Sequence, residues 1–287
     1  MLEQCVNFCC EIIGKLPLDC MQFTFMQTAL LATLFLAPLT AVAGVQVVNY
    51  RMAFFADTIG HSVFAGAALG VLFLGSNGAL WGMPLTALLI GIGVLFLQKT
   101  GKQASDTIIG VFFAFIVSLG LLLMSNNHNL PKAGQFIFGD ILLVTAQDTA
   151  LLIVLTIIYT LFITVSFNPL LLTAIDEDLA CTHRIKSMLF ELIHISLLAL
   201  IVIFTVKIAG VLLAGAMLIV PAAAARNWVK HAGRMFWCAA LIGLISGISG
   251  LFISAQDWAN FPAGATMVMI SCILFAASLI WKRLAVR

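Results

Sequence analysis

An aspartate and a histidine lie four residues apart, at Asp57 and His61, inside an otherwise apolar stretch of the chain. Residues at this spacing share one face of an α-helix, one turn apart. An imidazole nitrogen and a carboxylate oxygen are both accepted as ligands by divalent metals. An Asp at the centre of a bilayer costs about 3 kcal/mol, so such groups usually face a cavity, a partner or an ion. The pair therefore predicts a membrane protein that moves a small metal ion; a buried pair that only fixes helix packing is the alternative.

A second acid and imidazole, Glu191 and His194, are three residues apart near the end of another apolar run. We expect these to be interfacial side chains that reach the lipid headgroups, and a metal-ligand pair on the release side is the alternative. Two ligands are too few for a closed zinc site, so at Asp57 and His61 water, another helix or a second copy must complete the shell. Without cysteine ligands, zinc, manganese and ferrous iron all remain chemically suitable.

The composition excludes an aqueous fold, because 62% of the 287 residues are hydrophobic and only 9% are charged. Soluble domains carry about 25% charged residues. A bilayer core needs about 20 apolar residues per helix. We predict an all-α polytopic transmembrane helix bundle of eight or nine spans from the apolar runs 24–47, 52–74, 79–97, 108–124, 149–166, 189–206, 208–225, 236–254 and 265–281.

Two details of these runs bear on how the helices are arranged. Only Lys207 separates the runs 189–206 and 208–225, so we expect a tight hairpin or a partly re-entrant segment there. Gly66 and Gly70 have the spacing that lets membrane helices approach closely.

The chain divides into an N-terminal tail, residues 1–23, and one transmembrane domain, residues 24–287. The tail lacks the cationic start and the cleavage site of a removable signal peptide. None of the seven cysteines forms a CxxC pair, so we interpret them as small hydrophobic residues rather than as a disulfide or metal framework.

The basic residues are distributed unevenly between the predicted loops. With nine crossings and the N-terminus outside, 11 of the 14 Lys and Arg residues are cytoplasmic, and only Lys15, Lys132 and Lys207 are not. This bias predicts an outside N-terminus and a cytoplasmic C-terminus. Arg51 then marks the inner boundary of the second span, and the helical rise places His61 about 15 Å beyond it, near the midplane.

Five blocks of sequence, in the same order, resemble the permeases of the zinc, manganese and iron family of ABC importers. Together they extend over about residues 24–285, and bacterial high-affinity zinc permeases are the most similar. Through this resemblance Asp57 and His61 are expected to contact the metal on its pathway. The blocks are Arg51–Ser62, Asp106–Gly110, Phe138–Thr145 followed by Asp148, Gly210–Arg226 and Pro262–Thr266.

The resemblance also implies partners. It implies a homodimer in the lipid of a bacterial inner (plasma) membrane, a cytoplasmic ABC ATPase dimer and an extracytoplasmic metal-binding protein, with no role for nucleic acid. The metal is transported rather than bound permanently, as Zn²⁺ or as Mn²⁺ or Fe²⁺. A coupling helix that docks on the ATPase is expected in the cytoplasmic loop 167–188, with Asp176, Glu177, Asp178, Leu179, Ala180 and Arg184.

We favour the membrane-spanning permease subunit of an ATP-driven divalent-metal importer, which is not itself an enzyme. The sequence has no GxxxxGK[ST] phosphate loop, so ATP hydrolysis would belong to a partner subunit. The alternative is an ion-coupled secondary metal transporter without an ATPase, although no span-sized repeat is visible. An intramembrane metalloenzyme ranks last because the sequence contains no HExxH.

Overall fold

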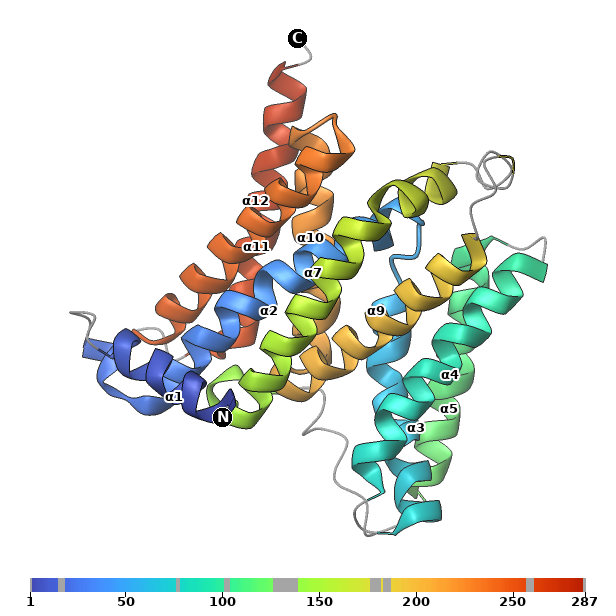
Figure 1. The fold of residues 1–287 in the computed structure, drawn as a ribbon, viewed down its shortest axis with the longest axis horizontal. Helices are drawn as coiled ribbons and strands as arrows, with labels where there is room; N and C mark the ends of the chain where they lie inside the picture. Colours follow the sequence, from blue (N-terminus) through green and yellow to red (C-terminus); the bar gives the residue numbers. More distant parts are fainter. Residues whose placement is uncertain are drawn as a thin grey trace. The chain divides into compact units, whose positions relative to one another are not determined.

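The computed structural model describes residues 2–14, 19–75, 78–100, 104–125, 139–175, 182, 187–256 and 261–285. All the regular structure in these ranges is helical, and nine of the helices are long and apolar enough to cross a membrane (Figure 1). Each coincides with one of the nine predicted runs, which confirms the all-α polytopic fold. The nine are α2 (Thr24–Asn49), α3 (Phe55–Leu74), α4 (Ala79–Thr100), α5 (Ser105–Ser125), α7 (Ala146–Ile175), α9 (Ser187–Ala209), α10 (Val211–Trp228), α11 (Ala232–Ser254) and α12 (Ala263–Ala285).

The helices group into two compact units. The first consists of Met1–Val45, Phe138–Thr160 and Ile208–Arg287, and the second of Gln46–Ile137 and Leu161–Lys207. In the first unit α10, α11 and α12 pack against one another, and the short 3₁₀ helix η2 (Ile141–Leu143) contacts α12. In the second unit α3 packs against both α4 and α5. Both of the acid and imidazole pairs belong to the second unit.

Helix α7 is longer than the apolar run that predicted it. It continues to Ile175 with Pro169 inside it, so the expectation of a loop beginning at residue 167 is wrong for residues 167–175. A proline removes one backbone N–H and tends to kink a helix, but in membrane helices neighbouring groups often satisfy the freed carbonyl. The predicted coupling residues Asp176, Glu177, Asp178, Leu179, Ala180 and Arg184 lie outside the described residues.

The break between α9 and α10 falls at Gly210, not at Lys207. Lys207 lies in the last turn of α9, where a cation interacts favourably with the helix dipole. Gly210 has φ 87°, a conformation that residues with a Cβ adopt only with strain. A Cβ on Gly139 would also lie 2.3 Å from the Gly210 nitrogen, so the backbones meet at two glycines. This contact gives a physical reason for glycine in the Phe138–Thr145 block.

The described part of the N-terminal tail includes a helix, α1 (Leu2–Ile13), and a short 3₁₀ helix, η1 (Asp19–Gln22). Val6 and Cys10 of α1 pack with Leu31 of α2 and Ala150 of α7 within the first unit. Burial raises the pKa of the Cys10 thiol, against a smaller opposite effect of its hydrogen bond with Thr28. Cys10 thus behaves as the small hydrophobic residue that the sequence predicts.

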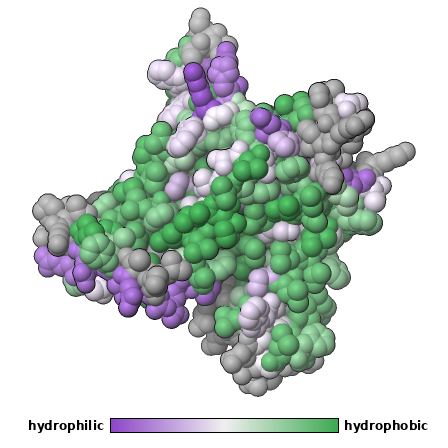
Figure 2. Space-filling model, viewed as in Figure 1, coloured by the Kyte–Doolittle hydropathy of each residue, from purple (hydrophilic) through white to green (hydrophobic). Residues whose placement is uncertain are grey.

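Large apolar side chains cover much of the surface, as Figure 2 shows for one face. Phe73 on α3 is 78% exposed and Trp237 on α11 is 77% exposed. Burying such side chains in hydrocarbon is favourable by about 2 kcal/mol each, whereas contact with water forfeits that free energy. The exposed apolar surface therefore fits helices surrounded by lipid.

Candidate functional site

Asp57 and His61 lie in the first two turns of α3. Asp57 is in the first turn, where the free backbone N–H groups and the helix dipole favour a negative charge. No side chain caps this end of the helix, since the N-cap residue is Phe54. His61 follows one turn later on the same face, about one turn before the midpoint of α3. Both side chains are half-buried.

Aromatic rings surround the imidazole of His61. The ring of Phe113, on α5, forms a T-shaped contact with it, with ring centroids 5.2 Å apart and planes at 90°. The ring of Phe64, one turn further along α3, is tilted at 49° with its centroid 5.9 Å away. Contacts of this kind help to fix the orientation of a ring. The two phenyl rings therefore orient the imidazole of His61.

No Lys or Arg among the described residues forms an ion pair with the carboxylate of Asp57. In the described ranges it makes no hydrogen bond to another group and no ion pair. The neighbouring hydroxyl groups are occupied within the helix: Thr58 donates to the Phe54 carbonyl at 3.0 Å and Ser62 to the Ile59 carbonyl at 2.6 Å. Asp57 and His61 are the only ionisable side chains on α3, so they are its only charged or readily charged groups.

Glycines on α3 and α4 set the position of the pair. A Cβ on Gly82 would lie 2.1 Å from the Gly66 carbonyl oxygen, and one on Gly66 would lie 2.2 Å from the Thr86 hydroxyl oxygen. A Cβ on Gly70 would meet the Gly78 carbonyl oxygen at 2.2 Å. The predicted close approach at Gly66 and Gly70 is therefore confirmed, and it holds α3 against α4 by backbone contact.

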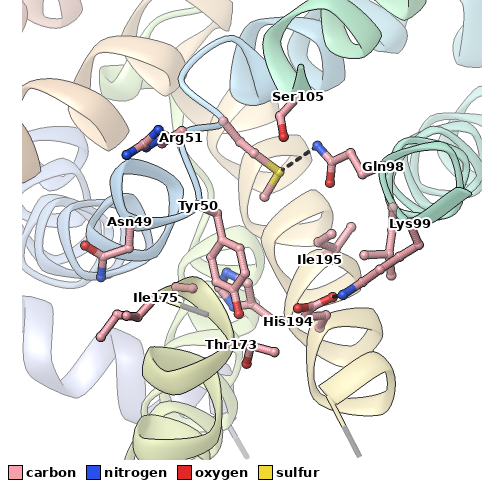
Figure 3. A pocket seen from close by; sticks show the side chains of 14 residues that line it. Asn49, Tyr50, Arg51, Gln98, Lys99, Ser105, Thr173, Ile175, His194 and Ile195 are labelled. Carbon is pink, nitrogen blue, oxygen red and sulfur yellow. Dashed lines mark hydrogen bonds and ion pairs between the residues drawn. The ribbon is translucent and has the colours of Figure 1, made fainter. Parts of the chain in front are cut away.

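The second pair, Glu191 and His194, lines a cavity of about 420 Å³ in the second unit. Residues at the end of α2, on α4, near the end of α7 and on α9 form its walls (Figure 3). Glu191 is 5% exposed and His194 1% exposed, so the expectation that they reach the headgroup region is wrong. The physical reason is an internal partner: Lys99, in the last turn of α4, places its Nζ 2.7 Å from Glu191 Oε2.

The imidazole of His194 lies nearly parallel to two aromatic rings. Its centroid is 6.1 Å from that of Tyr50 and 6.4 Å from that of Phe162, with interplanar angles of 24° and 12°. Tyr50 in turn donates its hydroxyl to the Leu170 carbonyl at 3.1 Å. Figure 3 shows Tyr50 and His194 side by side, with the Lys99 side chain extending toward them. Through these contacts, α9 packs against Tyr50, which follows α2, and against α7.

Neither pair is a complete metal site by itself. In the part of the chain that the structure describes, no group of three or more His, Cys, Asp and Glu side chains could hold a metal ion. Two donors on one helix face can contact a cation in transit while water or another chain supplies the other ligands. Such an incomplete shell suits passage rather than permanent retention.

The sequence did not reveal Lys99 as the partner of Glu191, nor Phe113 as the neighbour of His61. Both contacts join different helices, so spacing along the chain carries no information about them. The only available signal for Lys99 was its position at the end of an apolar run, which is shared by several other basic residues.

Comparison with known proteins gives a consistent result along almost the whole chain. The ABC 3 transport family matches residues 22–282. The high-affinity zinc uptake system membrane protein ZnuB of Haemophilus influenzae is 31% identical over 258 residues, which cover 90% of this chain and 97% of that protein. The manganese import system permease protein ScaB of Streptococcus parasanguinis is 30% identical over 257 residues, 90% of each chain.

A solved structure agrees with the sequence comparison. PsaBC from Streptococcus pneumoniae in complex with Fab contains a chain with a TM-score of 0.75 and 26% identity, covering 93% of both chains. An inward-facing putative metal-chelate type ABC transporter has a TM-score of 0.69 at 17% identity, covering 97% of this chain and 98% of that one, and supports the fold alone. The chain therefore belongs to the ABC 3 transport family.

Proposed function

We propose that this chain is the membrane-spanning permease subunit of an ABC importer for a divalent transition-metal ion, which passes Asp57 and His61 on its way. The observation that carries the proposal is an acid and an imidazole on one face of a membrane helix, half-buried and without a basic partner among the described residues. Such a pair is costly in hydrocarbon unless something charged or polar meets it. A cation in transit meets that requirement.

The choice of metal follows the donor types. One imidazole nitrogen and one carboxylate oxygen suit zinc, manganese and ferrous iron. Relatives named for zinc uptake and for manganese import are 31% and 30% identical to this chain, so identity does not separate these two metals. We propose Zn²⁺ as the first metal to test, with Mn²⁺ and Fe²⁺ as competitors.

The proposed assembly divides the work among several proteins. Two copies of this chain would form the pathway in a bacterial inner membrane, an extracytoplasmic metal-binding protein would deliver the ion, and a cytoplasmic ABC ATPase dimer would hydrolyse ATP. The N-terminus would lie outside and the C-terminus in the cytoplasm, as the distribution of basic residues predicts. Coupling would involve Asp176, Glu177, Asp178, Leu179, Ala180 and Arg184, in the proposed cytoplasmic loop.

The test is uptake of radioactive Zn²⁺, Mn²⁺ and Fe²⁺ into vesicles that contain this chain, the matching ATPase and the binding protein. We expect uptake that requires ATP and persists when proton and sodium gradients are collapsed. A non-hydrolysable ATP analogue is the matched control, because it binds the ATPase without driving repeated cycles. Uptake that follows an ion gradient and ignores ATP would contradict the proposal in favour of a secondary transporter.

A further inference from the structure

Five exposed basic residues lie where α10 and α12 end and α11 begins, in the first unit: Arg226, Lys230, Arg234, Lys282 and Arg283. In Figure 2 hydrophilic surface is gathered at this end of α12, next to the C-terminus marked in Figure 1. None of the five side chains forms an ion pair with a described residue. Their positive charge is therefore available to a partner.

Hydrogen bonds show that these helix ends lie together. Asn227 donates its side-chain amide to Ser278 Oγ at 3.0 Å, which joins the last turns of α10 and α12. Lys282 donates from Nζ to Asn227 Oδ1 at 3.3 Å. Only residues 229–231 separate α10 from α11, so the start of α11 belongs to the same end. The acceptor of Lys282 is a neutral amide, which leaves the charge of the ammonium uncompensated.

The acidic residues of the N-terminal tail lie at the opposite end of the first unit. A Cβ on Gly243 of α11 would lie 2.7 Å from the Ala37 carbonyl oxygen, and one on Gly247 would lie 2.9 Å from the Thr33 side chain. Helices α2 and α11 therefore run in opposite directions, and the basic end is beside the end of α2. The tail precedes α2, and α1 packs against the first half of α2. The acidic residues of the tail are Glu3, Glu11 and Asp19.

The other described acidic residues of the first unit are also far from the basic end. The backbone at Gly139 meets Gly210, which directly precedes α10, so Asp140 is near the start of α10 rather than its end. Asp148 is in the first turn of α7, where Ala150 packs with α1. The 18 residues of α10 give a separation of about 27 Å, beyond the reach of an ion pair. The first unit thus has separate acidic and basic ends.

Three exposed tryptophans accompany the basic residues. Trp228 is the last residue of α10, Trp237 lies in the second turn of α11, and Trp281 directly precedes Lys282. Their side chains are 41%, 77% and 64% exposed. Tryptophan is enriched at the interface of membrane and water, where its ring sits at the level of the lipid headgroups. The basic end therefore lies at headgroup depth, where lipid phosphates are the nearest anions.

We propose that this end of the first unit binds the headgroups of anionic phospholipids, with the five basic side chains contacting the phosphates and the three tryptophans anchoring the helices in the interface. A soluble acidic protein would match the charges equally well, but the exposed tryptophans favour lipid. Each Lys or Arg near an anionic membrane surface should raise the association constant roughly fivefold. The inference goes beyond the proposed function and holds whichever ion the protein carries.

The test uses lipids with brominated acyl chains, which quench tryptophan fluorescence on contact. The full-length protein keeps Trp237 as its only tryptophan and is placed in phosphatidylcholine nanodiscs that contain increasing fractions of brominated phosphatidylglycerol. Brominated phosphatidylcholine is the reference. We expect the association constant of phosphatidylglycerol at Trp237 to exceed that of phosphatidylcholine at least about fivefold. The preference should weaken in about 1 M NaCl, because salt screens the attraction between charges.

A pair of double variants tests whether the basic residues cause this preference. Lys230→Gln/Arg234→Gln removes the two charges nearest to Trp237 in the sequence, so the two lipids should associate about equally. Lys15→Gln/Lys132→Gln is the matched control, because it removes the same net charge elsewhere in the sequence and should keep the preference. Trp81 as the only tryptophan is a second control. It is 74% exposed, and the only basic residue of its helix is Lys99, in the last turn.

Equal association of the two lipids at Trp237 in the otherwise unchanged protein would overturn the proposal, and so would an equal response of the two double variants. The comparison of Trp237 with Trp81 needs no charge variant, so it remains decisive if a double variant does not fold. Addition of the ATPase separates lipid from a protein partner. Quenching by phosphatidylglycerol should persist in the complete transporter, whereas its loss would assign this end to a contact between proteins.

Discussion

Two acid and imidazole pairs in the second unit have nearly the same composition and opposite surroundings. On α3, Asp57 and His61 are half-buried, their neighbours are aromatic rings, and the carboxylate makes no ion pair with a described residue. On α9, Glu191 and His194 are buried, and the carboxylate is paired with Lys99. Residue types alone therefore do not define a cation site. Among the described residues, the two pairs differ in that Lys99 forms an ion pair with the carboxylate on α9, whereas no Lys or Arg forms one with the carboxylate on α3.

The largest expected effect is on transport through the α3 pair. Asp57→Ala or His61→Ala should reduce metal uptake at least about 100-fold, because even residues that only support metal ligands cost roughly 10- to 100-fold when mutated. Ser62→Ala is the matched control on the same helix, since its hydroxyl bonds only to the Ile59 carbonyl. Initial rates of ⁶⁵Zn²⁺ uptake, normalised to folded protein, provide the measurement. Wild-type uptake in either variant would remove α3 from the pathway.

A smaller effect is expected on the packing that positions the α3 pair. Gly82→Ala places a Cβ 2.1 Å from the Gly66 carbonyl oxygen, so the backbones must separate. We expect a loss of about 2–3 kcal/mol in unfolding free energy, typical of overpacking. Gly110→Ala on α5 is the control, because its Cβ would meet nothing within 4 Å in this chain. Thermal unfolding in detergent measures both, and equal midpoints would contradict the close approach.

Substitution of Glu191 on α9 should lower the free energy of unfolding of the protein rather than change its metal binding. Glu191→Ala leaves the Lys99 ammonium without its carboxylate, which we expect to cost about 1–3 kcal/mol, less than a fully buried pair because Lys99 is 21% exposed. Asp57→Ala should not lower stability, because relief from holding a half-buried carboxylate in the membrane outweighs the loss of about 0.5 kcal/mol from a favourable charge at a helix start. The comparison uses the same unfolding assay. A larger loss in Asp57→Ala than in Glu191→Ala would reverse the contrast between the two pairs.

The smallest effect concerns the ring beside His61. Phe113→Leu removes the edge-to-face contact at 5.2 Å but keeps an apolar side chain. Aromatic pairs of this kind contribute about 0.5–1.5 kcal/mol, so the concentration for half-maximal uptake should rise roughly two- to tenfold. Phe115→Leu is the control, because Phe115 is 61% exposed on the same helix. An equal response of the two variants would show that Phe113 does not orient the imidazole.

The sequence predicts the nine helices well because each depends on a local property, the length of an apolar run. The same is true of Asp57 and His61, whose shared face follows from a spacing of four residues. The end of α7 was missed because the apolar run ends at residue 166, whereas the helix continues through Pro169 to Ile175. The ion pair of Lys99 with Glu191 was missed because it joins two helices far apart in the chain, and no local pattern encodes such a contact.

The most direct test of contact between the transported ion and α3 is a change of ligand atom. In a variant without the seven native cysteines, His61→Cys should give zinc-loaded transporter a sulfur scatterer at about 2.3 Å in X-ray absorption spectra, the usual Zn–S distance. The parent protein with His61 should show only nitrogen and oxygen neighbours. A His61→Cys spectrum without sulfur, identical to that of the parent, would contradict the assignment of His61 to the metal pathway.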